Sequence, residues 1–341
     1  MNSTTPRIRL GLVGCGAYGE AHLSALRGIR TAEVGAVFDV DPARAARAAD
    51  RFGAARVCRS LAELCALPDL QAVDVVTPEP DHLPSVLAAL GAGKHVFLEK
   101  PMATDLGECR RMIDAARAAK RSLMVGHIVR FEPKYAMLRE EAAAGRLGRL
   151  VSLHARRNRM KSLLPTYNTR CHPVVEHCVH DIDIMLWTVG RPVKKVRGWG
   201  RNGSGSRNPD TFWGVLEFDG GALGVIETIW LLPPKAGVVL DDAFQVVGDR
   251  GVGTVSLVPG GLTFWREDGA STPDVQYDPV YAGAARGALR DELAYFTECL
   301  LDGREPDRIT PVDAMRAVRV ALALKLSAEE GRDVEIGEWD A

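Results

Sequence analysis

Three absences limit what this sequence encodes. The 341 residues contain no uncharged apolar run of membrane-spanning length, and residues 1–10 (MNSTTPRIRL) lack the apolar stretch of a secretory signal. The seven cysteines show neither CxxC nor zinc-finger spacing, which favours reduced thiols. We therefore expect a cytoplasmic protein without a membrane partner, whose chain starts with a short polar tail.

The sequence also lacks an excess of charge of either sign. Lys and Arg total 43 and Asp and Glu total 44, so the formal net charge is −1. This balance argues against a nucleic acid or an anionic membrane bound through bulk electrostatics. The hydrophobic fraction of 46% is ordinary for a globular protein, and the chain is long enough for two domains.

The first third of the chain alternates short apolar runs with helical patterns. This alternation is typical of a parallel, doubly wound α/β sheet of the Rossmann type. The expected strands are 8–13, 34–38, 73–76, 95–98 and 123–125, and the expected helices are 18–26, 42–52 and 106–119. We therefore predict a Rossmann dinucleotide-binding domain over residues 1–127.

The remaining chain changes character after a helical stretch at 133–144. Alternation of apolar and polar residues predicts strands at 150–154, 211–218, 222–230 and 244–247, with turns at 219–221 and 249–251. Residues 198–208 predict a mobile loop rich in glycine and serine, and 284–301 and 312–328 predict helices. We expect a C-terminal α+β domain over 128–341 with a large, mostly antiparallel sheet, and its last helices can pack back on the first domain.

A glycine-rich loop follows the first expected strand and opens a helix. Gly14, Gly16 and Gly19 fit the pattern G-x-G-x-x-G, with Ala17 and Tyr18 between the last two. The glycines permit a tight turn, a close approach of the main chain to a pyrophosphate, and close packing of helix on strand. The helix N-terminus then offers free N–H groups to the phosphates. This loop predicts a dinucleotide site.

Asp39 ends the second expected strand, at the distance where the dinucleotide pattern expects an acidic residue. A carboxylate there binds a ribose 2′-OH and repels a 2′-phosphate, so NAD is favoured over NADP. The nearby Arg44 softens that repulsion. An alternative is that Asp39 caps the next helix, although Asp41-Pro42 already makes a good helix start.

Two further segments carry candidate catalytic groups. In Gly93 to Pro101, the strand ends with Glu99-Lys100, at the edge of the sheet where ligands of open α/β folds bind. In the second half, Glu176, His180 and Asp183 precede an apolar run. Helical spacing predicts that these three residues share one helix face.

With these motifs in place, the sequence resembles the Gfo/Idh/MocA family of oxidoreductases, named for glucose–fructose oxidoreductase and inositol dehydrogenase. The resemblance runs along nearly the whole chain. The matching segments are the glycine loop, Thr77-Pro78 with His82, Glu99-Lys100-Pro101, Arg130-Phe131 with Pro133, His180-Asp181-x-Asp183, and the closing Asp313-Ala314 and Ser327 with Glu330-Gly331.

The resemblance implies a role for each matching position. Lys100 resembles the lysine between nicotinamide ribose and substrate hydroxyl, His180 the histidine that takes the hydroxyl proton, and Glu176 a residue that orients the substrate or His180. The cofactor contacts so predicted are Gly14, Gly16, Ala17, Tyr18, Gly19, Asp39, Thr77, Pro78, His82, Glu99 and Lys100. The substrate contacts predicted from the resemblance are Lys100, Arg130, Glu176 and His180. Arg157, from a basic stretch, and Tyr167 and His172, from the loop before the histidine motif, are further predicted substrate contacts.

The sequence departs from the family pattern at two places. Glu176 stands where many members carry aspartate, which keeps the charge and lengthens the side chain. Ile128 stands where many sugar dehydrogenases have asparagine and cannot offer its hydrogen bonds. The form Gly126-His127-x-x-Arg130-Phe131 is similar to some nucleotide-sugar 3-dehydrogenases instead.

A locally basic stretch adds a hypothesis about the substrate. Between Arg146 and Arg170 the chain has Arg149, Arg156, Arg157, Arg159 and Lys161 and no acidic residue. Such a stretch can hold a substrate phosphate or carboxylate, or else form a solvated strand face or a subunit contact. The alternative of a metal at His172, Glu176, His177, His180 and Asp181 is not favoured, because the family chemistry needs none.

These observations predict an NAD-dependent dehydrogenase that oxidises a secondary hydroxyl of a sugar or cyclitol, with a small molecule as substrate. The alternatives are a nucleotide-sugar or sugar-phosphate 3-dehydrogenase, a keto-sugar reductase, and a non-catalytic NAD-binding regulator. The resemblance also implies a homodimer or homotetramer that assembles through the broad sheet.

Overall fold

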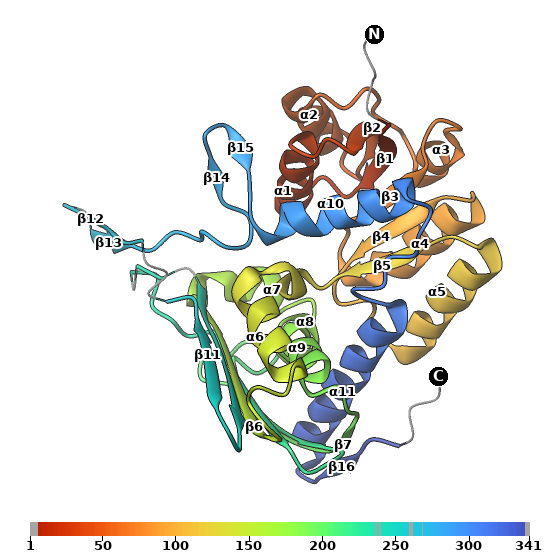
Figure 1. Ribbon diagram of the computed structural model, residues 1–341. Coiled ribbons are helices and arrows are strands. Elements are labelled where there is room, and N and C mark those ends of the chain that lie inside the picture. Colours follow the sequence, from red (N-terminus) through yellow and green to blue (C-terminus); the bar gives the residue numbers. More distant parts are fainter. Residues whose placement is uncertain (1–5, 236, 239, 259–261, 268, 338–341) are drawn as a thin grey trace. The chain divides into compact units, whose positions relative to one another are not determined.

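The computed structural model describes residues 6–235, 237–238, 240–258, 262–267 and 269–337 (Figure 1). The polar start expected over residues 1–5 lies outside this range. The chain divides into two units, Met1–Phe131 with Gln276–Met315, and Glu132–Val275 with Arg316–Ala341. None of the helices within the described ranges has both the length and the apolar character to cross a membrane.

A parallel five-stranded sheet forms the centre of the first unit, in the order β2-β1-β3-β4-β5. Its strands are β1 (Ile8–Val13), β2 (Ala32–Phe38), β3 (Ala72–Val75), β4 (His95–Glu99) and β5 (Leu123–Gly126). The helices of this unit are α1 (Ala17–Arg27), α2 (Pro42–Phe52), α3 (Leu61–Ala66), α4 (His82–Gly91), α5 (Leu106–Ala119) and the 3-10 turns Glu79–Asp81 and Ile128–Phe131. The predicted Rossmann sheet is confirmed.

Local sequence signals explain where these helices begin. The side chain of Asp41 accepts hydrogen bonds from the main-chain N–H groups of Ala43 and Arg44, so α2 begins at Pro42. Asp105 caps α5 in the same way through the N–H of Glu108. The expected bounds of both helices agree with the structure.

The first unit also contains a segment from late in the chain. It holds the hairpin β14 (Val280–Tyr281) and β15 (Ala284–Ala285), then α10 (Ala288–Leu301). The expected helix start at residue 284 is therefore wrong. Ala284 and Ala285 pair with β14, and Gly287 takes a φ of 82°, where a Cβ would collide with the carbonyl oxygen of Gln276.

A seven-stranded sheet dominates the second unit, in the order β11-β10-β6-β9-β8-β7-β16. Only β6 and β9 pair in parallel, so the expected mostly antiparallel sheet is confirmed. Its strands are β6 (Leu150–Arg159), β7 (Val193–Arg201), β8 (Thr211–Phe218), β9 (Leu223–Ile229), β10 (Leu240–Gly248), β11 (Val252–Ser256) and β16 (Val334–Glu335). A separate hairpin pairs β12 (Phe264–Arg266) with β13 (Gly269–Ser271).

Helices cover one face of this sheet. They are α6 (Pro133–Ala143), the 3-10 turn Lys161–Leu163, α7 (Leu164–Tyr167), α8 (Pro173–Glu176), α9 (Val179–Val189) and α11 (Pro311–Glu330), whose first turn belongs to the first unit. Tyr135 of α6 stacks on Phe244 of β10, with ring centroids 5.8 Å apart. Gly224 of β9 leaves room for Met185 of α9, whose sulfur would lie 2.8 Å from a Cβ at that position. This layer forms the core of the unit.

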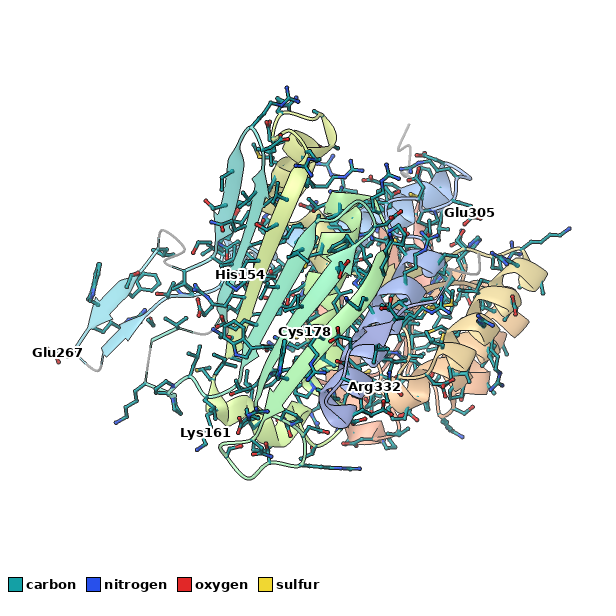
Figure 2. The ribbon with its side chains drawn as sticks, turned by 90° about the horizontal axis from the view of Figure 1, so that it is seen from below. His154, Lys161, Cys178, Glu267, Glu305 and Arg332 are labelled. Atoms are coloured by element: carbon teal, nitrogen blue, oxygen red, sulfur yellow. The ribbon has the colours of Figure 1, made fainter. Side chains whose placement is uncertain are left out.

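The opposite face of the sheet is open, with no described helix over it (Figure 2). His154 lies on this face, on the outward side of β6. Large apolar side chains are exposed there, with Trp199 at 41%, Trp213 at 40% and Leu223 at 46% of full exposure.

Three expectations for this unit need correction. Strand β7 was not expected, and it occupies residues 198–201 of the expected mobile loop. The rest of that loop is tied down, because Asn208 exchanges hydrogen bonds with Asn168 and because Asp210 accepts N–H groups of Gly203 and Ser204. The strand expected at 150–154 continues to Arg159.

Candidate active site

The glycine loop takes the form that its sequence predicts. Gly14 has a φ of 97° and donates its N–H to the carbonyl of Phe38 at 2.9 Å. A Cβ at Gly19 would collide with the carbonyl oxygen of Gly14, so this glycine permits the close contact of α1 with β1. Gly16 begins α1 without a side-chain cap, and a Cβ there would meet nothing within 4 Å. The main chain at Gly16, Ala17 and Tyr18 is thus open to a phosphate.

Asp39 is tied to this loop. Its Oδ2 accepts the N–H of Cys15 at 2.7 Å and its Oδ1 accepts the N–H of Asp41 at 2.8 Å. Asp41, not Asp39, caps α2, so the helix-cap alternative for Asp39 is wrong. Arg44 lies 3.5 Å from Asp39 Oδ1. Burial, with a further effect of Asp39, raises the pKa of the Cys15 thiol to about 12, so that thiol stays neutral.

Thr77 and Pro78 follow β3 at the same edge of the sheet. The Thr77 hydroxyl is buried and has no hydrogen-bond partner among the described residues. A buried unpaired hydroxyl is costly unless a ligand satisfies it, which fits a cofactor contact. Together with the open main chain at Gly16, this orphaned group shows that the residues present fit a dinucleotide.

His82 contacts two loops of the first unit. It is 1% exposed, with Nε2 3.0 Å from the carbonyl oxygen of Thr77 and Nδ1 3.0 Å from that of Pro101. Both ring nitrogens thus face main-chain carbonyls. His82 therefore holds together the two loops that carry Thr77 and Lys100, and its contact with the cofactor stays a prediction.

Lys100 follows β4 directly, at the carboxyl edge predicted for it. Its N–H donates to Oε2 of Glu99 at 3.1 Å. Glu99 is 5% exposed, and its Oε1 lies 3.2 Å from Nε2 of His22. Its carboxylate is thus directed to the interior of the unit and contacts the main chain of Lys100, and the cofactor contact of Glu99 stays a prediction.

Arg130 is also internal rather than a free substrate anchor. It is 3% exposed, donates to the carbonyl of Arg308 at 2.7 Å, and lies 3.7 Å from Asp313. Arg308 in turn donates to the carbonyl of Arg130 at 2.6 Å. These contacts give Arg130 a structural role within the first unit.

In the second unit, the residues of the histidine motif do not lie on one continuous helix. α8 ends at Glu176 and α9 begins at Val179, with His177 and Cys178 between them. The predicted single helix face for Glu176, His180 and Asp183 is therefore wrong. At the break, the carbonyl of Pro173 accepts the N–H groups of both His177 and Cys178.

His177 is the residue of this motif that sequence reasoning undervalued. Its Nδ1 lies 3.1 Å from Oε2 of Glu176. The centroid of its ring lies 4.9 Å from that of Trp230 and 6.5 Å from that of His180. Tyr167, the last residue of α7, also packs against Trp230, with ring centroids 5.9 Å apart. Glu176, His177, His180, Tyr167 and Trp230 therefore form one cluster, with Glu176 5% and His180 7% exposed.

His172 lies at the start of the same segment. Its Nδ1 accepts the N–H of Val174 at 3.2 Å, which caps α8, and its ring packs edge-on against Phe212 at 5.5 Å. Burial, reinforced by Lys325, lowers the pKa of His172 to about 4. The side chain is therefore neutral at pH 7 and is occupied as a cap, so the structure favours a positioning role over the predicted substrate contact.

The basic stretch is neutralised by carboxylates that come from elsewhere in the chain. Arg157 contacts Asp181 at 2.9 Å and Asp242 at 2.8 Å, and Arg159 also pairs with Asp242. Arg156 pairs with Asp241 at 2.8 Å. The reason is register: β10 runs beside β6 and places Asp241 and Asp242 opposite Asn158 and Arg157.

This network removes the basis for a phosphate subsite at the stretch. Arg157 is 2% exposed and Asp242 is fully buried. Burial acts to raise the pKa of Asp242, but Arg157 and Arg159 outweigh it and lower that pKa to about 2. Arg157 thus has a structural role under the histidine motif, and its predicted substrate contact is corrected accordingly.

Comparison with known proteins agrees with the geometry of both units. Residues 8–127 match the family description "Oxidoreductase family, NAD-binding Rossmann fold", and residues 135–253 match "GFO/IDH/MocA C-terminal domain". The chain is 37% identical over 211 residues to inositol 2-dehydrogenase of Acidothermus cellulolyticus, an alignment that spans 61% of each protein. It is 32% identical over 292 residues to inositol 2-dehydrogenase 2 of Saccharopolyspora erythraea, spanning 83% of each.

A solved structure shares the fold at lower sequence identity. Scyllo-inositol dehydrogenase from Lactobacillus casei, solved with NAD(H) and scyllo-inositol bound, superposes with a TM-score of 0.83 at 21% identity. The match covers 96% of this chain and 99% of that one. The likeness shows that the fold is shared over this length.

Proposed function

Because the chain belongs to the Gfo/Idh/MocA family of NAD-binding oxidoreductases, we propose that it oxidises a secondary hydroxyl of an inositol-like cyclitol or sugar to a ketone. The relatives described above that are at least 30% identical are named inositol 2-dehydrogenases, which supports a cyclitol as the first substrate class. The observation that carries the proposal is the buried Glu176–His177–His180 cluster of the second unit. Lys100 follows β4 at the carboxyl edge of the sheet in the first unit.

The reaction removes a proton and a hydride from one carbinol group. His180 accepts the hydroxyl proton, and Lys100 stabilises the negative charge that develops on the oxygen. Histidine suits the first task because its ordinary pKa is about 6.5, close to neutral pH. NAD, when bound, supplies the hydride acceptor, and the products are a ketone, the reduced cofactor and a proton.

Glu176 supports this chemistry from its place beside His177. A carboxylate held by a neighbouring imidazole has a defined direction, so it can bind a second hydroxyl of the ring and orient the substrate. A ring that carries several hydroxyls suits such a site, because each buried carboxylate needs donors. Tyr167 adds a phenol to the same cluster.

Asp39 supports NAD as the preferred cofactor. It already accepts two main-chain N–H groups, and a carboxylate in this position attracts a ribose hydroxyl and repels a 2′-phosphate. Arg44 is 3.5 Å away and partly offsets the repulsion. We therefore expect turnover with NADP to be measurable and weaker.

We also propose that the open face of the seven-stranded sheet pairs with a second copy of the chain. Trp199, Trp213 and Leu223 are exposed on it and would be covered in such a homo-oligomer. Light scattering coupled to size exclusion tests this, with Trp213→Asp expected to give monomers. A wild-type monomer would contradict it.

The experiment that tests the proposed activity is formation of reduced cofactor across a panel of inositols, free sugars, sugar phosphates and nucleotide sugars. We expect turnover with NAD and at least one inositol. Turnover restricted to phosphorylated or nucleotide-linked sugars would favour the alternative substrates. Reduction of a keto-sugar without the forward reaction would favour a reductase, and NAD binding without turnover in either direction would favour a regulator.

A further inference from the structure

A buried cluster of ionisable side chains lies inside the first unit, outside the roles assigned above. It comprises His22 of α1, Asp74 of β3, Glu99 of β4 and Glu292 of α10, each at most 5% exposed. Groups of this kind are rarely buried unless they are paired or perform a task. The four come from segments far apart in the sequence, and only Glu99 belongs to a recognised motif.

His22 links the cofactor loop to the catalytic lysine. Its Nδ1 lies 2.9 Å from Oδ2 of Asp74, and its Nε2 lies 3.2 Å from Oε1 of Glu99. The other oxygen of Glu99 accepts the N–H of Lys100 at 3.1 Å. A continuous path therefore runs from α1, which starts at the glycine loop, to the main chain of Lys100.

Glu292 lies on α10, a helix that packs against β4. Phe296, one turn later on the same helix face, packs edge-on against Phe97 of β4 with ring centroids 5.6 Å apart. Phe97 and Glu99 are two residues apart and point to the same side of the strand. Glu292 is fully buried, and no donor among the described residues forms a hydrogen bond to either of its carboxyl oxygens.

The charges in the cluster do not balance if every acid is ionised. Burial acts to lower the pKa of His22, but Asp74 and Glu99 outweigh it and raise the pKa to about 10, so His22 is a cation at pH 7. Asp74 and Glu99 both lie beside it, and burial raises the pKa of Asp74 against the opposing effect of His22. Burial, followed by the repulsion of Glu99, raises the pKa of Glu292 well above its ordinary value, against the weaker opposing effects of His22 and Arg308.

We propose that Glu292 is a positioning residue that carries a proton in the folded protein and, as a neutral acid beside His22 and Glu99, keeps Glu99 in place against the main chain of Lys100. A neutral O–H can donate to a carboxylate, whereas a third carboxylate would repel Glu99. That Lys100 acts on substrate rests on the proposed function; the protonation of Glu292 does not.

Infrared difference spectroscopy tests the protonation directly. The wild type at pH 7.5 should show the C=O stretching band of a buried carboxylic acid, and Glu292→Gln should lack it. Glu298→Gln, on an exposed position of the same helix, is the matched control and should keep the band. A wild type without such a band overturns the proposal. So does a band that survives in Glu292→Gln and disappears in Asp74→Asn.

Hydrogen exchange at the Lys100 amide tests the positioning without any substrate. Glu292→Gln keeps a neutral donor of the same size and should protect this amide as well as the wild type does. Glu292→Leu has no donor at this position. Because one hydrogen bond to Glu99 is lost, its Lys100 amide should exchange about tenfold faster or more. Equal protection in Glu292→Leu, or equal loss in both variants, overturns the positioning role.

Turnover gives a third readout that separates this inference from the proposed function. Glu292→Leu should lower kcat about tenfold with little change in the Kd for NAD, while Glu292→Gln stays within about twofold of wild type. An unchanged kcat in Glu292→Leu contradicts positioning of Lys100. Absence of turnover in the wild type contradicts the proposed function instead, and the infrared and exchange results then decide this proposal by themselves.

Discussion

The carboxylate of Asp39 accepts the main-chain N–H of Cys15 at 2.7 Å, so the residue that ends β2 is tied to the glycine loop that follows β1. One side chain thus shapes the phosphate loop and also lies where a ribose is expected. A change at Asp39 should therefore affect cofactor choice more than it affects the fold.

Asp39→Asn should lower the preference for NAD over NADP by about tenfold, equivalent to about 1.4 kcal/mol, because the repulsion of a 2′-phosphate is removed. Cofactor affinities measured by fluorescence titration check this. Asp41→Ala is the control: it removes the cap of α2 and should cost about 1 kcal/mol of stability without changing the preference. An unchanged preference in Asp39→Asn would show that Asp39 acts on the loop alone.

Lys100→Met should retain NAD binding and lose turnover by about a hundredfold or more, because one donor to the developing oxyanion is removed. The exposed Lys134→Met is the control and should be as active as wild type. Steady-state kinetics with separate NAD titrations distinguish the two effects. Undiminished kcat in Lys100→Met would remove this lysine from the mechanism.

Asp242 should contribute stability that depends on pH in a defined direction. Its pKa of about 2 lies below the ordinary 3.8, so its contribution is present above pH 3.8 and is lost as the pH falls towards 2. Asp242→Asn should lower the free energy of unfolding at pH 7 by about 3 kcal/mol, since it leaves Arg157 and Arg159 short of a partner.

Chemical denaturation at a series of pH values checks this prediction. The difference between wild type and Asp242→Asn should shrink as the pH approaches 3. A difference that stays constant over this range would mean that the carboxylate is not held by the arginines.

His172 should also make stability depend on pH, over a higher pH range than Asp242 does. Its pKa of about 4 lies below the ordinary 6.5, so the folded protein excludes a proton that the unfolded chain binds between these values. As the pH falls below 6.5, the wild type should lose about 1.4 kcal/mol of stability per pH unit relative to His172→Asn, down to about pH 4. Parallel stability curves for the two proteins would contradict a neutral, buried His172.

The parts of the fold that follow from sequence are those with local signals. Asp41-Pro42 and Asp105 mark helix starts, and Thr211–Phe218 alternates cleanly, so these elements were predicted with correct bounds. Strand β7 was missed because its inward positions include Gly198, which leaves room for α11 and breaks the apolar pattern. That space is set by a helix more than a hundred residues later.

In the candidate site, too, residues in local motifs could be predicted and their distant partners could not. The glycine loop, Lys100 and His180 stand in short motifs and could be identified from the sequence. The partners of Arg157 could not, because Asp181 and Asp242 reach it through the packing of α9 and the register of β10. The link between His22 and Glu99 also joins residues without a shared motif. Ion pairs between residues far apart in the chain therefore could not be predicted from the sequence.

The measurement that tests the central claim most directly is transfer of deuterium from a ring-deuterated inositol, labelled at its carbinol carbons, to NAD. The reduced cofactor isolated after one turnover should carry one deuterium, and His180→Asn should bind NAD with similar affinity but form about a hundredfold less of it. Reduced cofactor without deuterium, or full transfer in His180→Asn, would contradict hydride transfer from a carbinol carbon with His180 as the base.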